Sequence, residues 1–259
     1  MTDSTNLNGQ VAIVTGGARG IGRGIAKVLS ESGARVVVGD VLDATQTVEE
    51  IVSEGHEATS IIVDTSSPDD ASALVDQAID HYGQLDIIVN NAALDSFNWS
   101  EHGSPNSWDL SGDLWRRVID VNLSGVFYCS KAALVPMMKA GSGCIINMSS
   151  VSAVLGSKSI PPAYNASKAG VIGLTLAMST QLVDKGIRVN AIMPNLVESR
   201  DYGWSKEEEV ERGKQYPLGV VKPKDVAEAV LYLVSPAARV ISGTVLQLNG
   251  GYQRGAVFV

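Results

Sequence analysis

The chain has 259 residues, of which 45% are hydrophobic and 19% charged, and its net charge is −8. This composition excludes a natively unfolded chain, and the length fits one large α/β domain or two small ones. Acidic residues are in excess and neither sign forms a long block, which argues against a nucleic acid as partner.

The first ten residues are polar and lack the basic and apolar regions of a secretory signal, and no apolar run approaches about 18 residues. The two cysteines, Cys129 and Cys144, stand in apolar stretches without metal-binding spacing, and the histidines are scattered singly. We therefore expect a soluble cytoplasmic protein without a metal site or a membrane partner, whose cysteines are buried thiols in a reducing compartment.

Short runs rich in β-branched residues alternate with longer segments of helical period, which is typical of a parallel sheet covered by crossover helices. The predicted strands are Val11–Thr15, Arg35–Gly39, Ala58–Val63, Ile87–Asn90, Cys144–Met148, Arg188–Ile192 and Thr244–Leu248. The predicted helices are Ile21–Ser32, Ala44–Ser53, Asp69–Tyr82, Leu114–Lys139, Tyr164–Val183 and Lys224–Val234. We expect one domain over residues 1–259, an α/β fold with a doubly wound parallel sheet and helices on both faces.

Two segments interrupt this alternation, residues 94–113 and residues 195–222, and we expect both to be structureless. Loops this long in a compact domain are usually functional. Since both follow strands, and open α/β sheets bind ligands beyond the carboxyl ends of their strands, both should overhang one crevice and hold substrate. The candidate substrate contacts there are Trp99, His102, Arg200, Tyr202 and Trp204. This polar and aromatic set favours a sugar, a polyol or a small hydroxy compound.

The glycine-rich stretch Thr15–Gly22 follows the first strand and opens a helix. Glycines allow a tight turn there and let a pyrophosphate approach the backbone amides and the positive dipole of the helix N-terminus. The spacing is G-x-x-x-G-x-G rather than G-x-G-x-x-G, so a purely structural turn remains the alternative. The strand–turn–helix setting favours a nucleotide cofactor, in contact with Gly16, Arg19, Gly20, Ile21 and Gly22.

Asp40 ends the second strand, eighteen residues beyond Gly22. A carboxylate there accepts hydrogen bonds from an adenosine ribose and repels a 2′-phosphate, so its placement favours NAD over NADP. Arg19 can partly offset that charge, which keeps NADP as the alternative, and a solvated cation is the other interpretation of Arg19. A helix N-cap is the other interpretation of Asp40. Asp64, after the third strand, either touches the adenine or forms a turn.

Tyr164 and Lys168 stand four residues apart, on one face of a predicted helix. Free tyrosine has a pKa of about 10, and a nearby ammonium favours the phenolate, which makes Tyr164 a usable general base near neutral pH. A second pair with this spacing is Tyr202 and Lys206. Only Tyr164 follows a strand that ends in hydroxyls, including that of Ser150. We therefore interpret Tyr164 as catalytic and Tyr202 as a loop residue that can line the substrate.

The motifs TGGARGIG, NNAA, VNLSG, NMSS, YNASK and RVNAIMPN follow one another along the chain. Each is weak alone, but the ordered set resembles the classical short-chain dehydrogenase/reductase (SDR) family over nearly the whole chain. The resemblance implies a Rossmann-type fold and the NAD(P)-dependent interconversion of a secondary alcohol and a ketone. It also implies a homotetramer, often assembled through the two long helices.

By the same resemblance, Tyr164 is the acid/base, while Lys168 lowers its pKa and holds the nicotinamide ribose. Ser150 polarises the substrate oxygen, and Asn122 holds a proton-relay water behind Lys168. The other cofactor contacts that the resemblance implies are Asn91 and Ala92 beside the cofactor, and Pro194, Val197 and Ser199 at the nicotinamide end.

The chain departs from the family's usual pattern in places. Ser150 lies fourteen residues before Tyr164, one more than the commonest spacing, so Ser152 can share or replace its role. The usual Pro-Gly after the sixth strand is Pro-Asn at 194–195, and Ser199 replaces a threonine that contacts the carboxamide. Asn-Gly-Gly replaces Asp-Gly-Gly after the last strand, which we expect to alter subunit packing more than chemistry.

Three competing functions stay open at this point. A 3-oxoacyl-carrier-protein reductase would use NADPH and a basic docking patch, against which Asp40 and the net charge of −8 argue. A hydroxysteroid dehydrogenase would need a more apolar lid. A non-catalytic NAD(H)-binding sensor would not need the complete catalytic set. The sequence therefore favours an NAD-dependent dehydrogenase, in which NAD preference favours oxidation.

Overall fold

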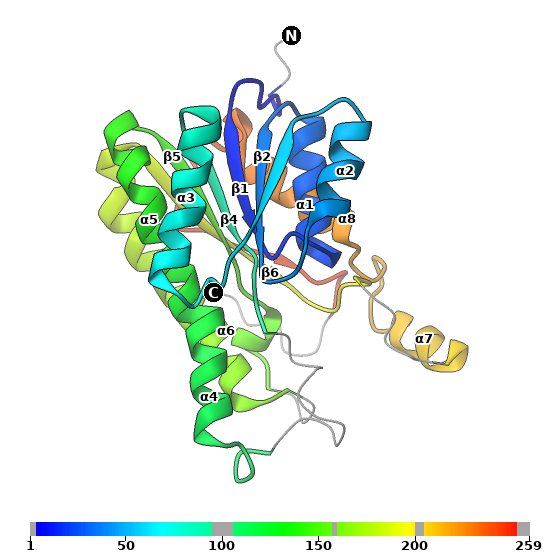
Figure 1. Ribbon diagram of the computed structural model, residues 1–259. Helices are drawn as coiled ribbons and strands as arrows, with labels where there is room; N and C mark the ends of the chain where they lie inside the picture. The colour runs from blue at the N-terminus through cyan, green and yellow to red at the C-terminus, as the bar shows by residue number, and fades with distance from the viewer. Residues whose placement is uncertain (1–3, 95–105, 157–159, 200–204, 253–259) are drawn as a thin grey trace.

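The computed structural model describes residues 4–94, 106–156, 160–199 and 205–252 as one sheet with helices on both faces (Figure 1). All strand pairs are parallel, in the order β3-β2-β1-β4-β5-β6-β7. The strands are β1 (Val11–Thr15), β2 (Arg35–Asp40), β3 (Ala58–Ile62), β4 (Ile87–Asn90), β5 (Gly143–Met148), β6 (Ile187–Pro194) and β7 (Val245–Leu248). The predicted seven-stranded, doubly wound sheet is confirmed.

Two hydrophobic layers hold the helices to the sheet, one on each face. The first joins the sheet to α1 and α8 through Ile25 and Val230, and the second joins it to α3, α5 and α6 through Leu74, Ala133 and Met178. The helices are α1 (Gly20–Glu31), α2 (Thr45–Ser53), α3 (Pro68–Tyr82), α4 (Gly112–Ile119), α5 (Gly125–Ala140), α6 (Pro162–Leu182), α7 (Lys206–Gly213) and α8 (Pro223–Val234).

Local sequence explains where these elements begin and end. Strand β1 is buried throughout and apolar up to Thr15, as expected for a central parallel strand covered on both faces. Helix α3 begins where the Ser67 hydroxyl accepts a hydrogen bond from the Asp70 N–H and Pro68 occupies the first turn. It ends at Gly83, whose φ of 79° suits glycine.

The sheet order creates the crevice. Strands β1 and β4 are neighbours in the sheet although β2 and β3 lie between them in the chain. The crossover connections therefore leave β1 and β4 toward opposite edges, which opens a ligand crevice at their carboxyl ends.

One expectation about the helices is wrong, and two predicted helices differ only in detail. Residues 195–222 are not structureless, since α7 forms within them from a glutamate-rich stretch with good helix propensity but little apolar periodicity. The predicted single helix Leu114–Lys139 is α4 and α5 joined by a π-helical turn, Asp120–Ser124. Helix α6 begins at Pro162 rather than Tyr164, because proline suits the first turn.

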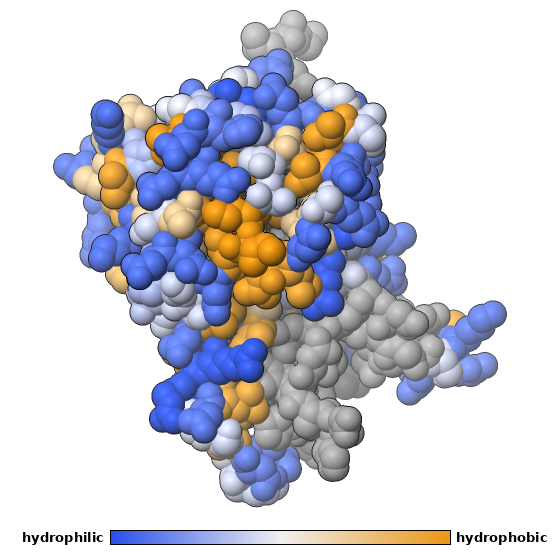
Figure 2. All heavy atoms as spheres, viewed as in Figure 1, coloured by the Kyte–Doolittle hydropathy of each residue, from blue (hydrophilic) through white to orange (hydrophobic). Residues whose placement is uncertain are grey.

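The face seen in Figure 2 is mostly hydrophilic, with an apolar patch near its centre over β3. The exposed hydrophobic residues at the ends of β2 and β3 are Val41, Leu42 and Ile62. Although it contains no uninterrupted apolar run of about 18 residues, the helical segment Gly112–Ala140 is long and apolar enough on average to cross a membrane by length and composition. Core helices of soluble proteins meet the same criterion, so this one segment is weak support for a membrane span.

Candidate active site

A cleft of about 1250 Å³ opens at the carboxyl ends of the strands. Its walls come from the turn after β1, the ends of β2, β4, β5 and β6, and the start of α6. Leu94 and Asp113 from one interrupting segment and Val197 and Tyr216 from the other also line it. The described parts of both segments therefore border the same crevice, as predicted.

The glycine-rich turn packs tightly against the chain that follows β4. A β-carbon on Gly22 would lie 2.1 Å from the carbonyl oxygen of Gly16, and one on Gly16 would lie 2.8 Å from the Cα of Ala92. Asn91 Nδ2 donates to the carbonyls of Thr15 and Gly16, both at 3.0 Å. Asn91 and Ala92 thus hold the turn in place.

The N-terminus of α1 faces the cleft without a side-chain cap. Arg19 is the N-cap residue and makes no capping hydrogen bond, and Gly20, Ile21 and Gly22 line the cleft. An uncapped N-terminus presents backbone N–H groups and the positive end of the helix dipole, which fits a pyrophosphate. The exposed Arg19 side chain also lines the cleft and pairs with none of the described residues.

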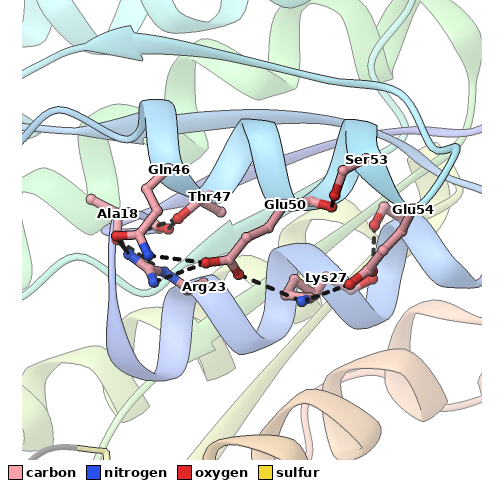
Figure 3. A network of polar contacts seen from close by, with 10 residues as sticks. Ala18, Arg23, Lys27, Gln46, Thr47, Glu50, Ser53 and Glu54 are labelled. Atoms are coloured by element: carbon pink, nitrogen blue, oxygen red, sulfur yellow. Dashed lines mark hydrogen bonds and ion pairs between the residues drawn. The ribbon is translucent and has the colours of Figure 1, made fainter.

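A polar network behind the turn holds the carbonyl of Ala18 against α1 and α2 (Figure 3). Arg23 donates to this oxygen from Nη2 at 2.6 Å and from Nε at 3.2 Å, and the buried Thr47 hydroxyl donates to it at 3.2 Å. Arg23 and Lys27 pair with Glu50 at 3.4 and 3.5 Å. The Ala18 carbonyl and the Arg19 N–H belong to one peptide unit. Because the C=O and N–H of a trans peptide point in opposite directions, the Arg19 N–H points away from the network.

The two acidic candidates have different surroundings. Asp40 is only 8% exposed, and its two oxygens accept hydrogen bonds from the N–H groups of Ala18 and Leu42 at 2.9 and 3.0 Å. Neither bond caps α2. The Asp64 carboxylate accepts from the N–H and the hydroxyl of Ser66, at 2.9 and 2.7 Å, which is a turn-forming role. Both residues line the cleft.

Tyr164 and Lys168 lie in the first turns of α6 and both line the cleft. Lys168 is 3% exposed, and its Nζ lies 5.7 Å from the centre of the Tyr164 ring. Nζ donates to the carbonyl of Met148 at 2.8 Å. Burial lowers the pKa of Lys168 to about 8. At neutral pH a buried cation therefore stands beside the phenol.

The two candidate serines are hydrogen-bonded to each other. Ser150 lies two residues beyond the end of β5, and its Oγ accepts from the N–H of Ser152 and donates to the Ser152 Oγ, both at 3.2 Å. Both line the cleft with Tyr164. Ser150 is thus near the strand end, and Ser152 is its hydrogen-bond partner.

Asn122 lies fully buried in the π-helical turn between α4 and α5. Its Oδ1 accepts from the N–H of Leu94 at 2.7 Å, and its Nδ2 donates to the Leu94 carbonyl at 3.0 Å. A longer contact of 3.4 Å joins Nδ2 to the Ser167 hydroxyl. Its side chain therefore ties the segment after β4 to the helices, and π-helical turns are frequent at functional sites.

The chain beyond β6 closes one end of the cleft. Pro194, Val197 and Ser199 all line it, and Val197 forms an isolated parallel bridge with Val221. A β-carbon on Gly20 would lie 3.6 Å from the Cβ of Ser199, so Ser199 lies against the glycine turn.

The candidates Trp99, His102, Arg200, Tyr202 and Trp204 lie outside the described residues. Sequence reasoning missed many residues of the cleft, among them Val41 and Leu42 beside Asp40, and Tyr216 and Tyr252, whose ring centres are 5.3 Å apart in a stacked pair. The exposed apolar pair after the acidic residue was a usable signal. No local pattern brings Tyr216 and Tyr252 together, because they meet through tertiary folding.

The described residues contain no group of three or more His, Cys, Asp or Glu that could hold a metal ion. Cys129 and Cys144 are free and buried, and burial raises the pKa of their thiols to about 12 and about 11. Thiols in this state are poor nucleophiles, which agrees with a packing role.

Comparisons with known proteins agree with this geometry. Residues 16–253 match the family described as enoyl-(acyl carrier protein) reductase. The chain is 37% identical to a cis-4-hydroxycyclohexanecarboxylate dehydrogenase of Sinomonas cyclohexanicum, covering 94% of this chain and 96% of the relative. It is 37% identical to a cyclohexanol dehydrogenase of an Acinetobacter species, covering 96% and 97%. A 3-oxoacyl-[acyl-carrier-protein] reductase of Staphylococcus aureus is also 37% identical, with coverage of 93% and 96%.

Solved structures show the same relationship. A putative short-chain alcohol dehydrogenase from Sinorhizobium meliloti superimposes with a TM-score of 0.88 at 31% identity, covering 96% of this chain and 98% of that one. The expected resemblance is therefore confirmed: the chain belongs to the short-chain dehydrogenase/reductase family, whose members use a nicotinamide cofactor, and it acts on CH–OH groups.

Proposed function

We propose that this protein is an NAD-dependent dehydrogenase that oxidises a secondary alcohol on a small hydroxylated ring compound. The observation that carries the proposal is the grouping of Tyr164, Lys168 and Ser150 in the same cleft as Asp40. The first three supply proton transfer and oxygen binding, and Asp40 selects the cofactor.

One feature of the cleft favours NAD over NADP, and two exposed residues beside it suit the adenine that both cofactors share. The Asp40 carboxylate stands at the end of β2, where it would accept ribose hydroxyls and repel a 2′-phosphate. The exposed side chains of Val41 and Leu42 beside it suit the flat face of an adenine. Arg19 is the feature that favours NADP, and its lack of a described partner leaves it available.

The described residues fit a dinucleotide along the whole cleft. The uncapped N-terminus of α1 would take the pyrophosphate, and Pro194, Val197 and Ser199 would hold the nicotinamide end. Turn-forming Asp64 also lines the cleft, and in this proposal it would approach the adenine. The bound nicotinamide would accept a hydride from the carbinol carbon.

The chain's own residues would move the proton. The Ser150 hydroxyl would bind the substrate oxygen, and Tyr164 would remove the proton of the substrate hydroxyl as the ketone forms. The Lys168 ammonium, 5.7 Å from the phenol ring, favours the phenolate form. In the proposed relay, Asn122 would position a water behind Lys168, and its side chain fixes the neighbouring Leu94 segment.

The relatives narrow the substrate class. The names of two relatives specify an alcohol on a cyclohexane ring, and a third, a glucose 1-dehydrogenase of Bacillus subtilis, acts on a sugar. A six-membered ring bearing a hydroxyl is common to these cyclohexane alcohols and to the ring form of a sugar, and a sugar is among the substrates that the polar loops favour.

The assembly we propose is a cytoplasmic homotetramer built through α5 and α6. The exposed hydrophobic side chains Phe127, Val135 and Met138 on α5 and Leu176 on α6 support it, since such groups mark interfaces. The two free, buried cysteines support a reducing compartment.

The proposal is tested by following nicotinamide reduction with NAD and with NADP against ring alcohols, sugars, steroids and open-chain alcohols. We expect NAD-linked turnover of ring alcohols, and a loss of about 10²–10⁴ in kcat for Tyr164→Phe with NAD binding retained. Turnover only with NADP and 3-oxoacyl thioesters would favour the acyl-carrier reductase. Steroid-only activity would favour a hydroxysteroid dehydrogenase. No hydride transfer with any substrate, with NAD still bound, would favour the sensor.

A further inference from the structure

Asn195 lines the cleft, and its side-chain amide has no hydrogen-bond partner among the described residues. It follows Pro194 at the end of β6, and its backbone N–H donates to the Leu248 carbonyl at 2.8 Å. Its Nδ2 is buried without a hydrogen-bond partner, and no described residue bonds to its Oδ1. A buried amide left unpaired is unfavourable, so such a group in a native fold calls for a ligand or another explanation.

The other buried asparagines with an unpaired atom differ from it. Among the described residues these are Asn90 and Asn165, each through Oδ1. Asn90 Nδ2 donates to Asn147 at 2.8 Å, and Asn165 Nδ2 donates to the Leu155 carbonyl at 3.2 Å. Neither lines the cleft. Asn195 alone of these combines an unpaired amide with a place in the ligand space.

Strand pairing places Asn195 beside the reacting groups. Met148 pairs with Ile192, and the Ser149 N–H donates to the Ile192 carbonyl at 2.8 Å. Ser150 and Asn195 therefore leave neighbouring strands at the same edge of the sheet, and such strands lie about 4.8 Å apart.

Two stacked tyrosine rings line the cleft on the side of β6 that faces away from β5. Pro194 pairs with Leu248 of β7, and the chain beyond β7 brings Tyr252 to the cleft, stacked on Tyr216. Suppose that the reacting oxygen of a substrate ring contacts Ser150. The ring would then extend from the end of β5 toward the two tyrosines and pass the Asn195 amide.

We propose that Asn195 is a specificity-determining residue whose side-chain amide hydrogen bonds with a second oxygen of the substrate. The inference rests on the proposed function and adds to it a preference for ring alcohols that carry another hydroxyl. Glycine, the usual residue in this motif, has no group to make the bond. An analogue without the second oxygen leaves the amide unpaired and is discriminated against.

The test compares kcat/KM for cyclohexanol with that for the 1,2-, 1,3- and 1,4-cyclohexanediols, using whichever of NAD or NADP supports turnover. We expect the wild type to prefer at least one diol by about tenfold, the value of one good hydrogen bond. Asn195→Leu, which keeps the branched shape of the side chain but has no polar atom, and Asn195→Gly, which restores the usual residue, should both lose this preference. Their kcat/KM for cyclohexanol and their Kd for the cofactor should stay within about threefold of the wild type. Having both variants keeps the test valid if one fails to fold.

Three results would overturn the assignment. A wild type that oxidises cyclohexanol and all the diols equally well refutes it and leaves the proposed function standing. Variants that keep the diol preference but bind the cofactor weakly would place Asn195 at the nicotinamide instead. A wild type that oxidises none of the ring alcohols contradicts the proposed function, and this inference with it.

Discussion

Lys168 shows how a single buried charge couples stability to function. Burial lowers its pKa from 10.5 to about 8, so between those values the folded protein binds fewer protons than the unfolded chain. Stability from this group therefore rises with pH across that window, and below about pH 8 the full cost of the buried ammonium is present. The shift corresponds to about 3 kcal/mol.

We predict that Lys168→Met abolishes turnover and changes stability in a pH-dependent way. At pH 7, removing the buried ammonium should raise the free energy of unfolding by about 3 kcal/mol. Leaving the Met148 carbonyl without its donor should lower it by about 1–3 kcal/mol. Between pH 7 and pH 10.5 the wild type gains stability as its lysine becomes neutral, and the variant does not. The free energy of unfolding of the variant relative to the wild type should therefore fall by about 3 kcal/mol over this range. Urea unfolding without cofactor measures this. The control Lys139→Met, at an exposed position, should differ from the wild type in free energy of unfolding by the same amount at every pH. A pH-independent difference for Lys168→Met would contradict the argument.

At the scale of elements, the junction of β1 and α1 depends on the absence of side chains. Gly22 lies within the first turn of α1, yet a β-carbon there would lie 2.1 Å from a backbone oxygen. Gly173 lies within α6 with nothing within 4 Å of such a carbon. Both are helical glycines, so intrinsic propensity alone treats them alike and only packing separates them.

We predict opposite effects for the two alanine substitutions. Gly173→Ala should stabilise the protein by about 0.5–1 kcal/mol through helix propensity. Gly22→Ala should destabilise it by about 1–3 kcal/mol through overpacking and weaken NAD binding, because the turn must open. Thermal unfolding with and without NAD checks both, and equal melting temperatures for the pair would refute the packing argument.

At the scale of the whole molecule, α5 carries an exposed stripe at helical spacing. Phe127, Val135 and Met138 are 43%, 74% and 49% exposed and share one face. Covering such a stripe with a second copy of the chain would remove its apolar area from water.

We predict that the wild type sediments as a tetramer and that Val135→Glu shifts it to a smaller species, since a charge would be buried at the interface. Val210 on α7 is 63% exposed and offers a matched control, because Val210→Glu should leave the tetramer intact. Sedimentation velocity separates the species. A monomeric wild type, or an unchanged Val135→Glu tetramer, would exclude assembly through α5.

The sequence by itself determined the sheet, most of the helices and the chemistry-bearing motifs. These follow from short-range signals: β-branched runs, helical periodicity, the glycine turn after β1, and the four-residue spacing of Tyr164 and Lys168. It favoured Ser150 over Ser152 but left open whether Ser152 contributes, and it missed α7 because glutamate-rich helices lack apolar periodicity.

The tertiary structure alone decided which side chains are buried, paired or left without partners. Only packing lowers the pKa of Lys168, holds Asn122 on Leu94 and stacks Tyr216 on Tyr252. The unpaired amide of Asn195 likewise depends on neighbours from other strands. Burial and hydrogen bonding between distant residues arise when the sheet brings its strand ends together, and no local pattern in the chain encodes them.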